Sequence, residues 1–118
     1  MGQRRRKKPK RLGEKLLAIR FKLEVSQSQL AKLLDFDKGI ARISEYEHGN
    51  REPDLMTLLK YSELARVSMN VLADDTRELK FPENWKRPKR VTDSLLEQQR
   101  VRIQDRIDNL RSQLSRSL

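Results

Sequence analysis

The first two thirds of the chain carry apolar residues at helical spacing. The first helix is predicted by a row on one helical face, formed by Leu12, Leu16, Ile19 and Leu23. Further short amphipathic segments follow, and none alternates apolar and polar residues as a half-buried strand does. The pattern therefore predicts an all-α domain of five short helices, the first of which ends near Glu24.

The second helix has a clear start signal. Ser26 and Gln29 have the spacing of a capping box, in which each side chain accepts a hydrogen bond from the other residue's backbone amide. Val25 and Leu30 lie where a hydrophobic staple belongs. The second helix is therefore expected to start at Ser26 and to end near residue 34.

A turn precedes the third helix. The aspartates and the glycine within residues 35–39 favour a turn, and a helix is predicted to follow from Ile40 to His48. Ile43 and Tyr46 are three residues apart, so both are expected to face the second helix and to belong to the core. Gly49 suits the left-handed position that follows a helix.

Polar caps predict the fourth and fifth helices. Asp54 is expected to cap the fourth helix, whose inward residues are predicted to be Leu55, Leu58, Leu59 and either Tyr61 or Ser62. Ser68 is expected to cap a short fifth helix that ends near Ala73, with Val67 and Leu72 as its staple. These helices complete a predicted domain at residues 12–75.

The last part of the chain reads as a linker and a helix. Residues 76–91 contain two prolines and no helical period, which predicts an extended linker. Thr92 is expected to cap a final helix over residues 92–118. Its apolar residues follow a short coiled-coil-like heptad seam, formed by Leu96, Ile103, Ile107, Leu110 and Leu114, with Arg100 in the remaining inner position. A helix of this length is marginal alone, so it needs a second copy, the domain body or another protein as its partner.

The net charge of +10 is unevenly distributed. Residues 1–11 carry seven basic residues and no acidic one, residues 12–81 have a net charge of −1, and residues 82–118 have a net charge of +4. We therefore expect residues 1–11 to form a basic, disordered arm. Such an arm binds polyanions, most often by neutralising phosphates; a solubilising terminus or attraction to an anionic membrane are the alternatives.

Several motifs in a fixed order resemble the Cro/Xre class of DNA-binding domains, also called lambda-repressor-like. The resemblance is carried by Arg20, SQSQLA at 26–31, ISEYEHGNREP at 43–53 and LMTLLKYSELARVS at 55–68. It covers about half of the chain. It implies a five-helix domain with a helix-turn-helix, in which the helix near residues 40–48 reads the major groove.

The resemblance also implies roles for individual residues. Glu47 is expected to form a structural ion pair with Arg20. The residues expected to contact bases are Lys38, Arg42, Ser44 and Glu45; an arginine can bind guanine and a glutamate can accept from cytosine. Phosphate contacts are expected from Gln27, Ser28, Asn50 and Arg51. The charge of the arm, and not the resemblance, predicts further phosphate contacts from Arg4, Arg5, Arg6, Lys7 and Lys8.

The turn departs from the pattern of the class. Ile43 lies thirteen positions after Leu30, two more than the class usually has, and Asp35 stands where a glycine is common. The longer turn changes which side chains lead into the groove, and it leaves two orientations open for Lys38.

Catalysis has few candidate residues. The chain has one His and no Cys, no Gly-rich phosphate loop and no Ser/His/Asp set. No enzymatic activity, metal or cofactor is therefore expected. No apolar run reaches the length of a membrane span, so no membrane association is expected.

The sequence favours sequence-specific binding of double-stranded DNA by a transcription regulator, a repressor of bacterial or phage type. It would act as a homodimer in the cytoplasm, at the nucleoid. The alternative is an antitoxin-like protein or assembly adapter whose helix at residues 92–118 binds a partner protein. RNA binding through the basic segments is a third possibility.

Overall fold

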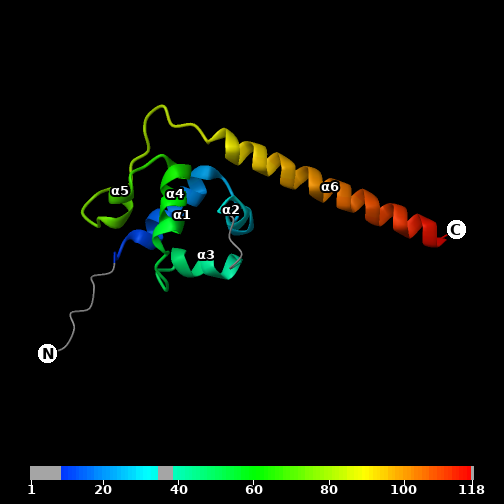
Figure 1. Ribbon diagram of the computed structural model, residues 1–118, viewed down its shortest axis with the longest axis horizontal. Coiled ribbons are helices and arrows are strands. Elements are labelled where there is room, and N and C mark those ends of the chain that lie inside the picture. The colour runs from blue at the N-terminus through cyan, green and yellow to red at the C-terminus, as the bar shows by residue number, and fades with distance from the viewer. Residues whose placement is uncertain (1–8, 35–38, 118) are drawn as a thin grey trace. The chain divides into compact units, whose positions relative to one another are not determined.

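Every regular element in the described part of the chain, residues 9–34 and 39–117, is a helix (Figure 1). The computed structural model contains α1 (Leu12–Leu23), α2 (Gln27–Leu33), α3 (Ile40–Glu47), α4 (Leu55–Ala65), α5 (Met69–Ala73) and α6 (Lys89–Ser117). The contacts divide the chain after Arg87, so that α1 to α5 belong to one compact unit and α6 to another. The all-α fold is as the pattern predicted.

The predicted caps of α2, α4 and α5 are confirmed. The Ser26 hydroxyl accepts from the Gln29 amide at 3.0 Å, and the Gln29 side chain accepts from the Ser26 amide at 2.9 Å, which completes the capping box of α2. An Asp54 carboxylate oxygen accepts from the Thr57 amide at 2.8 Å at the start of α4. Ser68 caps α5 in the same way. These three helices therefore begin where their side chains satisfy unpaired amides.

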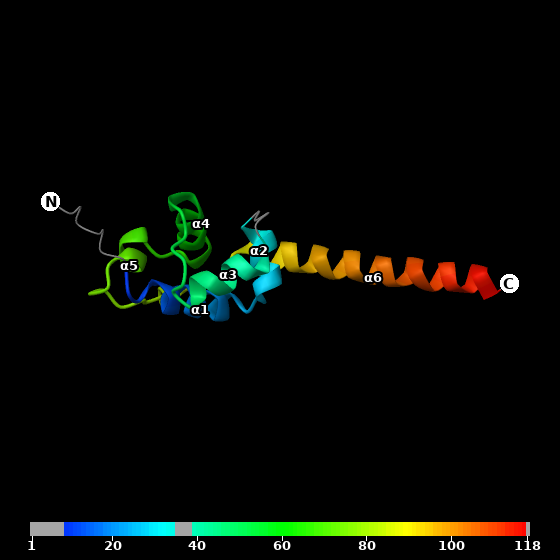
Figure 2. The same cartoon turned by 90° about the horizontal axis from the view of Figure 1, so that it is seen from below.

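The core of the first unit is centred on α1. Leu16, Ile19 and Leu23 of α1 are fully buried, and α1 contacts α3, α4 and α5. From the other helices the largest fully buried residues are Leu30, Ile43, Tyr61, Leu64 and Leu72. The shorter α2 packs against α3, and Figure 2 shows the two side by side. A single apolar core thus holds both helices that the sequence assigned to the helix-turn-helix.

One prediction for α4 is wrong. Leu55 was expected to face inward, but it is 71% exposed, and the neighbouring Met56 is exposed as well. The buried side of α4 begins with Thr57, two residues after Leu55, and continues with Tyr61. The first turn of α4 therefore projects beyond the core.

Residues 76–87 pack on the domain, where we had expected an extended linker. The Trp85 indole donates to the Ala65 carbonyl at 2.9 Å, at the end of α4. The Lys22 ammonium lies 5.2 Å from the centre of the Phe81 ring and 5.1 Å from that of Trp85, and Arg87 donates to the last carbonyl of α1 at 3.2 Å. Packing of both aromatic rings on Lys22 fixes this segment to α1 and α4.

The final helix starts earlier than expected. It begins at Lys89, not at a capping Thr92, because the Pro88 carbonyl accepts from the amides of Val91 and Thr92 at 2.9 and 3.3 Å. A proline has no amide to leave unpaired and fits well at the start of a helix. Residues 99–117 of α6 are all exposed.

Gly13 allows close contact between α1 and the end of α3. A Cβ atom at this position would lie 2.8 Å from the Tyr46 carbonyl oxygen and 2.9 Å from that of Glu47. Both neighbours are backbone atoms, which cannot rotate away. The glycine therefore sets how closely α1 approaches the C-terminal turn of α3.

The first prediction follows from this contact. Gly13→Ala is expected to lower the free energy of unfolding by about 1–3 kcal/mol, because the two helices must separate to admit the methyl group. Urea unfolding followed by the fluorescence of the single Trp85 measures the change. The control is Glu63→Ala at an exposed position of α4, expected to change stability by no more than about 0.5 kcal/mol. Equal effects of the two substitutions would contradict the close-contact role.

Candidate nucleic-acid interface

Two short helices form the candidate interface. α2 and α3 contact each other and are joined by a connection that includes residues 35–38, which lie outside the described residues (Figure 2). Gly39 stands immediately before α3 with φ of 86°, a conformation that favours glycine. At the other end of α3, Gly49 has φ of 76° and ends the helix as expected. The glycines thus define α3 as a compact helix of two turns.

The carboxylate of Glu47 joins three helices. It accepts from Arg20 of α1 through two hydrogen bonds, of 2.6 Å from Nε and 3.1 Å from Nη2. It also accepts from the Gln27 side chain of α2 at 2.9 Å. The Glu47 side chain is only 3% exposed and that of Arg20 is 14% exposed. The pair expected from the resemblance is therefore present as a bidentate, largely buried ion pair.

This network also constrains its surroundings. A further hydrogen bond of 3.2 Å runs from Arg20 Nη1 to the Val25 carbonyl in the α1–α2 connection. Burial, and next the negative charge of Glu47, raise the pKa of the Tyr61 hydroxyl. Tyr61 therefore stays neutral beside the carboxylate. Through these contacts the orientation of α2 and α3 relative to α1 is fixed by polar geometry as well as by packing.

A row of alternating charges lies on the outer face of α3 and in the loop that follows it. Glu45 lies between two arginines, 3.6 Å from Arg42 Nε and 2.8 Å from Arg51 Nε. The side chains of Arg42, Glu45 and Arg51 are 28%, 41% and 50% exposed. Glu45 thus holds both arginines on the solvent side of the helix. In this arrangement Glu45 positions the arginines and also presents an acceptor of its own.

The other residues expected to contact DNA differ in their exposure and in their partners. Ser44 is half-buried, and its hydroxyl and carbonyl oxygens lie 3.3 and 2.8 Å from Nδ1 of the exposed His48. Ser28 and Asn50 are exposed, at the first turn of α2 and just after α3. Gln27 is half-buried and donates a hydrogen bond to Glu47. Lys38 and the arm residues Arg4, Arg5, Arg6, Lys7 and Lys8 lie outside the described residues.

Two residues of the candidate face were not singled out from the sequence. Ile40 is 48% exposed and Ala41 is also exposed, although both open the helix that carries the charged row. The first residues of a recognition helix contact base edges, and small apolar groups can contact the thymine methyl. The missed signal was their position at the start of α3, which helical periodicity alone does not mark as exposed.

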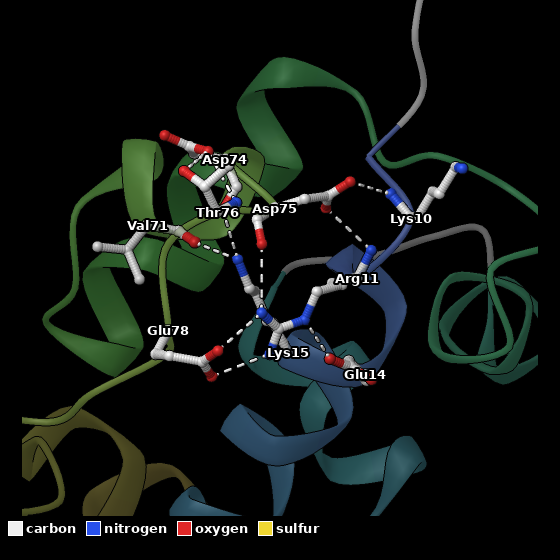
Figure 3. Close-up of polar contacts among 9 residues, drawn as sticks. All are labelled: Lys10, Arg11, Glu14, Lys15, Val71, Asp74, Asp75, Thr76 and Glu78. Carbon is white, nitrogen blue, oxygen red and sulfur yellow. Dashed lines mark hydrogen bonds and ion pairs between the residues drawn. The ribbon is translucent and has the colours of Figure 1, made fainter.

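The root of the N-terminal arm is bound to the domain. The amides of Lys10 and Arg11 donate to the two carboxylate oxygens of Asp75 at 2.8 and 3.0 Å (Figure 3). The Arg11 guanidinium donates to both carboxylate oxygens of Glu78 at 3.0 Å, and to Glu14 at 2.8 Å. We had expected a disordered arm through residue 11. These two residues instead are ordered, because Asp75 accepts from both backbone amides and Glu78 pairs with the Arg11 guanidinium.

The same cluster contains a buried lysine. Lys15 is 2% exposed, and its ammonium group donates to the carbonyls of Val71 and Asp74 at 2.7 and 2.9 Å (Figure 3). These carbonyls lie at the C-terminal end of α5, where unpaired acceptors favour a cation. The amides of Lys10 and Arg11 lower the pKa of Asp75, and hydrogen bonding from Arg11 lowers that of Glu78. The cluster thus anchors Lys10 and Arg11 to the domain. Only the residues before Lys10 remain as the expected arm.

Comparison with known protein families agrees with this geometry. Residues 16–72 match the family model described as helix-turn-helix, of the Cro/C1 type. The chain carries a Cro/C1-type helix-turn-helix domain. The matched segment begins within α1 and ends within α5, so it includes the Glu47 network and the charged row of α3. Such domains bind DNA.

Comparisons with curated proteins and with solved structures identified no similar protein. Among the described residues, no helix has the length and apolar character needed to span a membrane. The helix-turn-helix assignment therefore rests on the family match and on the geometry of α1 to α5.

The second prediction concerns the buried ion pair of the helix-turn-helix domain. Glu47→Gln is expected to cost about 3–5 kcal/mol of unfolding free energy, because it leaves the Arg20 charge buried without a counter-charge. Glu45→Gln removes an exposed pair on the same helix and is expected to cost less than about 1 kcal/mol. Urea unfolding of both variants, followed by circular dichroism, makes the comparison. A Glu47→Gln protein as stable as Glu45→Gln would show that the pair does not hold the domain together.

Proposed function

We propose that this protein is a sequence-specific transcription regulator, a repressor of bacterial or phage type that binds double-stranded DNA as a dimer. The observation that carries the proposal is a charged row: Arg42 and Glu45 lie on the outer face of α3, which Glu47 fixes in place, and Arg51 continues the row in the loop after the helix. A recognition helix must be held rigidly for its side chains to distinguish bases. In this proposal the protein acts in the cytoplasm, at the nucleoid.

Base recognition is assigned to the exposed side of α3. Arg42 would fork onto the O6 and N7 acceptors of a guanine, and Glu45 would accept from the amino group of a cytosine. Ser44 is a further polar contact, and Ala41 would contact a thymine methyl. Lys38, just before α3 in the chain, belongs to the same proposed set.

Phosphate binding is assigned to residues on either side of α3. Gln27 and Ser28 lie in the first turn of α2, which crosses the DNA backbone in a helix-turn-helix. Asn50 and Arg51 follow α3 and would contact a second phosphate. Gln27 uses one amide hydrogen for Glu47 and keeps the other for a phosphate oxygen. Glu47 therefore positions a phosphate contact as well as the recognition helix.

The third prediction tests base reading by Arg42. After selection of a preferred duplex from a random pool, Arg42→Ala is expected to weaken binding to that duplex by about 1–3 kcal/mol and to relax the preference at one base pair. Titrations against the selected duplex and its single-base variants measure both effects. Arg77→Ala is the control, because Arg77 is an exposed arginine that pairs with Asp74, outside α3. A uniform loss on all duplexes with unchanged preference would remove Arg42 from the base-reading set.

The fourth prediction tests the arm, whose basic residues Arg4 to Lys8 precede the anchored Lys10 and Arg11. Deletion of residues 1–8 is expected to weaken binding to all sequences alike. It should also make the slope of log affinity against log salt less steep by up to about 4.5, since five basic residues are lost. Because Lys10 and Arg11 remain, the anchor of α1 is kept. An arm of equal length with glutamine at positions 4–8 is the matched variant, and an unchanged salt slope in both would refute the role of the arm.

A second candidate function is supported by the apolar seam of α6. Five apolar residues of this helix, Leu96, Ile103, Ile107, Leu110 and Leu114, are between 38% and 66% exposed. An antitoxin-like protein or adapter would use such a seam to bind a different protein, with DNA binding secondary. Light scattering of the purified chain distinguishes the two: a stable dimer supports the regulator, and a monomer supports the adapter.

A further inference from the structure

The helix α6 has an apolar face that none of the described residues of its own unit covers. In heptad terms, Leu96, Ile103 and Leu110 occupy d positions, while Ile107 and Leu114 occupy a positions. Arg100 occupies the remaining a position and is 81% exposed. The seam from Leu96 to Leu114 is about 27 Å long at the rise of an α-helix. Charges along its edges determine which pairing a second copy of this helix could adopt.

Parallel pairing would place like charges together. In that arrangement identical a residues face each other, so Arg100 would face Arg100 of the second copy across the seam. Each g residue would lie beside the e residue five positions later in the partner helix. Arg106 of each copy would therefore lie next to Arg111 of the other, which gives two arginine–arginine contacts. The parallel pair thus contains three arginine–arginine contacts, and no opposite charges among its facing e and g positions.

Antiparallel pairing removes most of this repulsion. When each a residue faces a d residue, the apolar layers become Leu96 with Leu114 and Ile103 with Ile107, each formed twice. Arg100 then lies opposite Leu110, and the two Arg100 side chains are separated by about 15 Å along the axis. That distance exceeds the Debye length of about 8 Å at physiological salt.

The same register creates two attractive pairs. The e positions face each other, so Glu97 of each copy lies beside Arg111 of the other. Within its own helix Glu97 lies 3.7 Å from Arg100, so it would neutralise both arginines. The one unfavourable contact is Arg106 with its counterpart on the two-fold axis. Two opposite-charge pairs and one like-charge pair replace the three like-charge contacts of the parallel alternative.

We propose that α6 pairs with α6 of a second copy of this chain in an antiparallel coiled coil, with Glu97 and Arg111 as the pairs that set the direction. The proposal deepens the proposed function, on whose dimer it rests. Its consequence is geometric: the two helix-turn-helix domains attach at opposite ends of the coiled coil. The two Pro88 residues would lie about 50 Å apart along its axis, more than the roughly 34 Å of one DNA turn.

Disulfide trapping in the full-length chain tests the direction directly, because the protein has no cysteine of its own. Two variants are made, Leu96→Cys and Leu114→Cys, one of them with an affinity tag. In the antiparallel pair residues 96 and 114 face each other, so a mixture of the two variants should give a mixed disulfide dimer. Each variant alone should stay largely uncrosslinked. Rapid disulfide formation by Leu96→Cys alone would overturn the proposal in favour of parallel pairing.

Charge reversal gives an independent readout by sedimentation equilibrium. Arg111→Glu places Glu97 beside a second glutamate in the antiparallel pair, so the dimer dissociation constant should rise by roughly tenfold. The double variant Glu97→Arg with Arg111→Glu should restore it. In a parallel pair Arg111→Glu would instead relieve repulsion from Arg106 and tighten the dimer. Arg102→Glu makes the same charge change on the outer face of α6 and should leave the dimer unchanged.

The outcomes separate this inference from the proposed function. A tighter dimer with Arg111→Glu overturns the antiparallel direction and leaves a dimeric regulator. A monomeric wild-type chain overturns the pairing of α6 altogether. The sequence preference that depends on Arg42 can then still be measured on a DNA duplex with a single half-site. If the wild-type protein forms the antiparallel dimer but shows no DNA sequence preference, only the proposed function is overturned.

Discussion

The arrangement of the helix-turn-helix domain depends on one buried carboxylate. Glu47 stands at the end of α3 and accepts hydrogen bonds from Arg20 of α1 and Gln27 of α2. A buried ion pair adds little net stability compared with apolar packing, but it is strict about geometry because each lost hydrogen bond leaves a desolvated charge. Apolar contacts alone would tolerate small rotations of so short a helix. The bidentate pair removes that freedom, and the outer face of α3 is oriented as a result.

Cations at helix C-termini hold the rest of the domain together. Lys15 donates to carbonyls at the end of α5, Lys60 donates to the Leu34 carbonyl at the end of α2, and Arg87 donates to the Leu23 carbonyl at the end of α1. The last carbonyls of a helix have no partner within it and carry partial negative charge. Long basic side chains satisfy them while their methylene stems cover apolar surface. A small and highly charged domain can in this way use part of its charge for folding.

The basic residues of the chain therefore divide into structural and available groups. Arg11, Lys15 and Arg20 are basic like the residues of the arm. Carboxylates or carbonyls of the domain nevertheless bind all three. Arg42 and Arg51 are also paired, but with the exposed Glu45, from which a nucleic acid could take them over. Net charge alone thus overstates how much of the protein is free to bind a polyanion.

The sequence by itself determined the features that depend on neighbouring residues. The caps at Ser26, Asp54 and Ser68 each join groups three residues apart, and the buried rows of α1 and α3 repeat with the helical period. Only the tertiary structure decided the contacts between distant segments. Arg11 meets Glu78 and Lys15 meets Val71 across 67 and 56 positions, and Trp85 bonds to Ala65 across 20. No local pattern encodes such pairs. The same reason explains Leu55, whose exposure depends on where the core ends and not on its own periodicity.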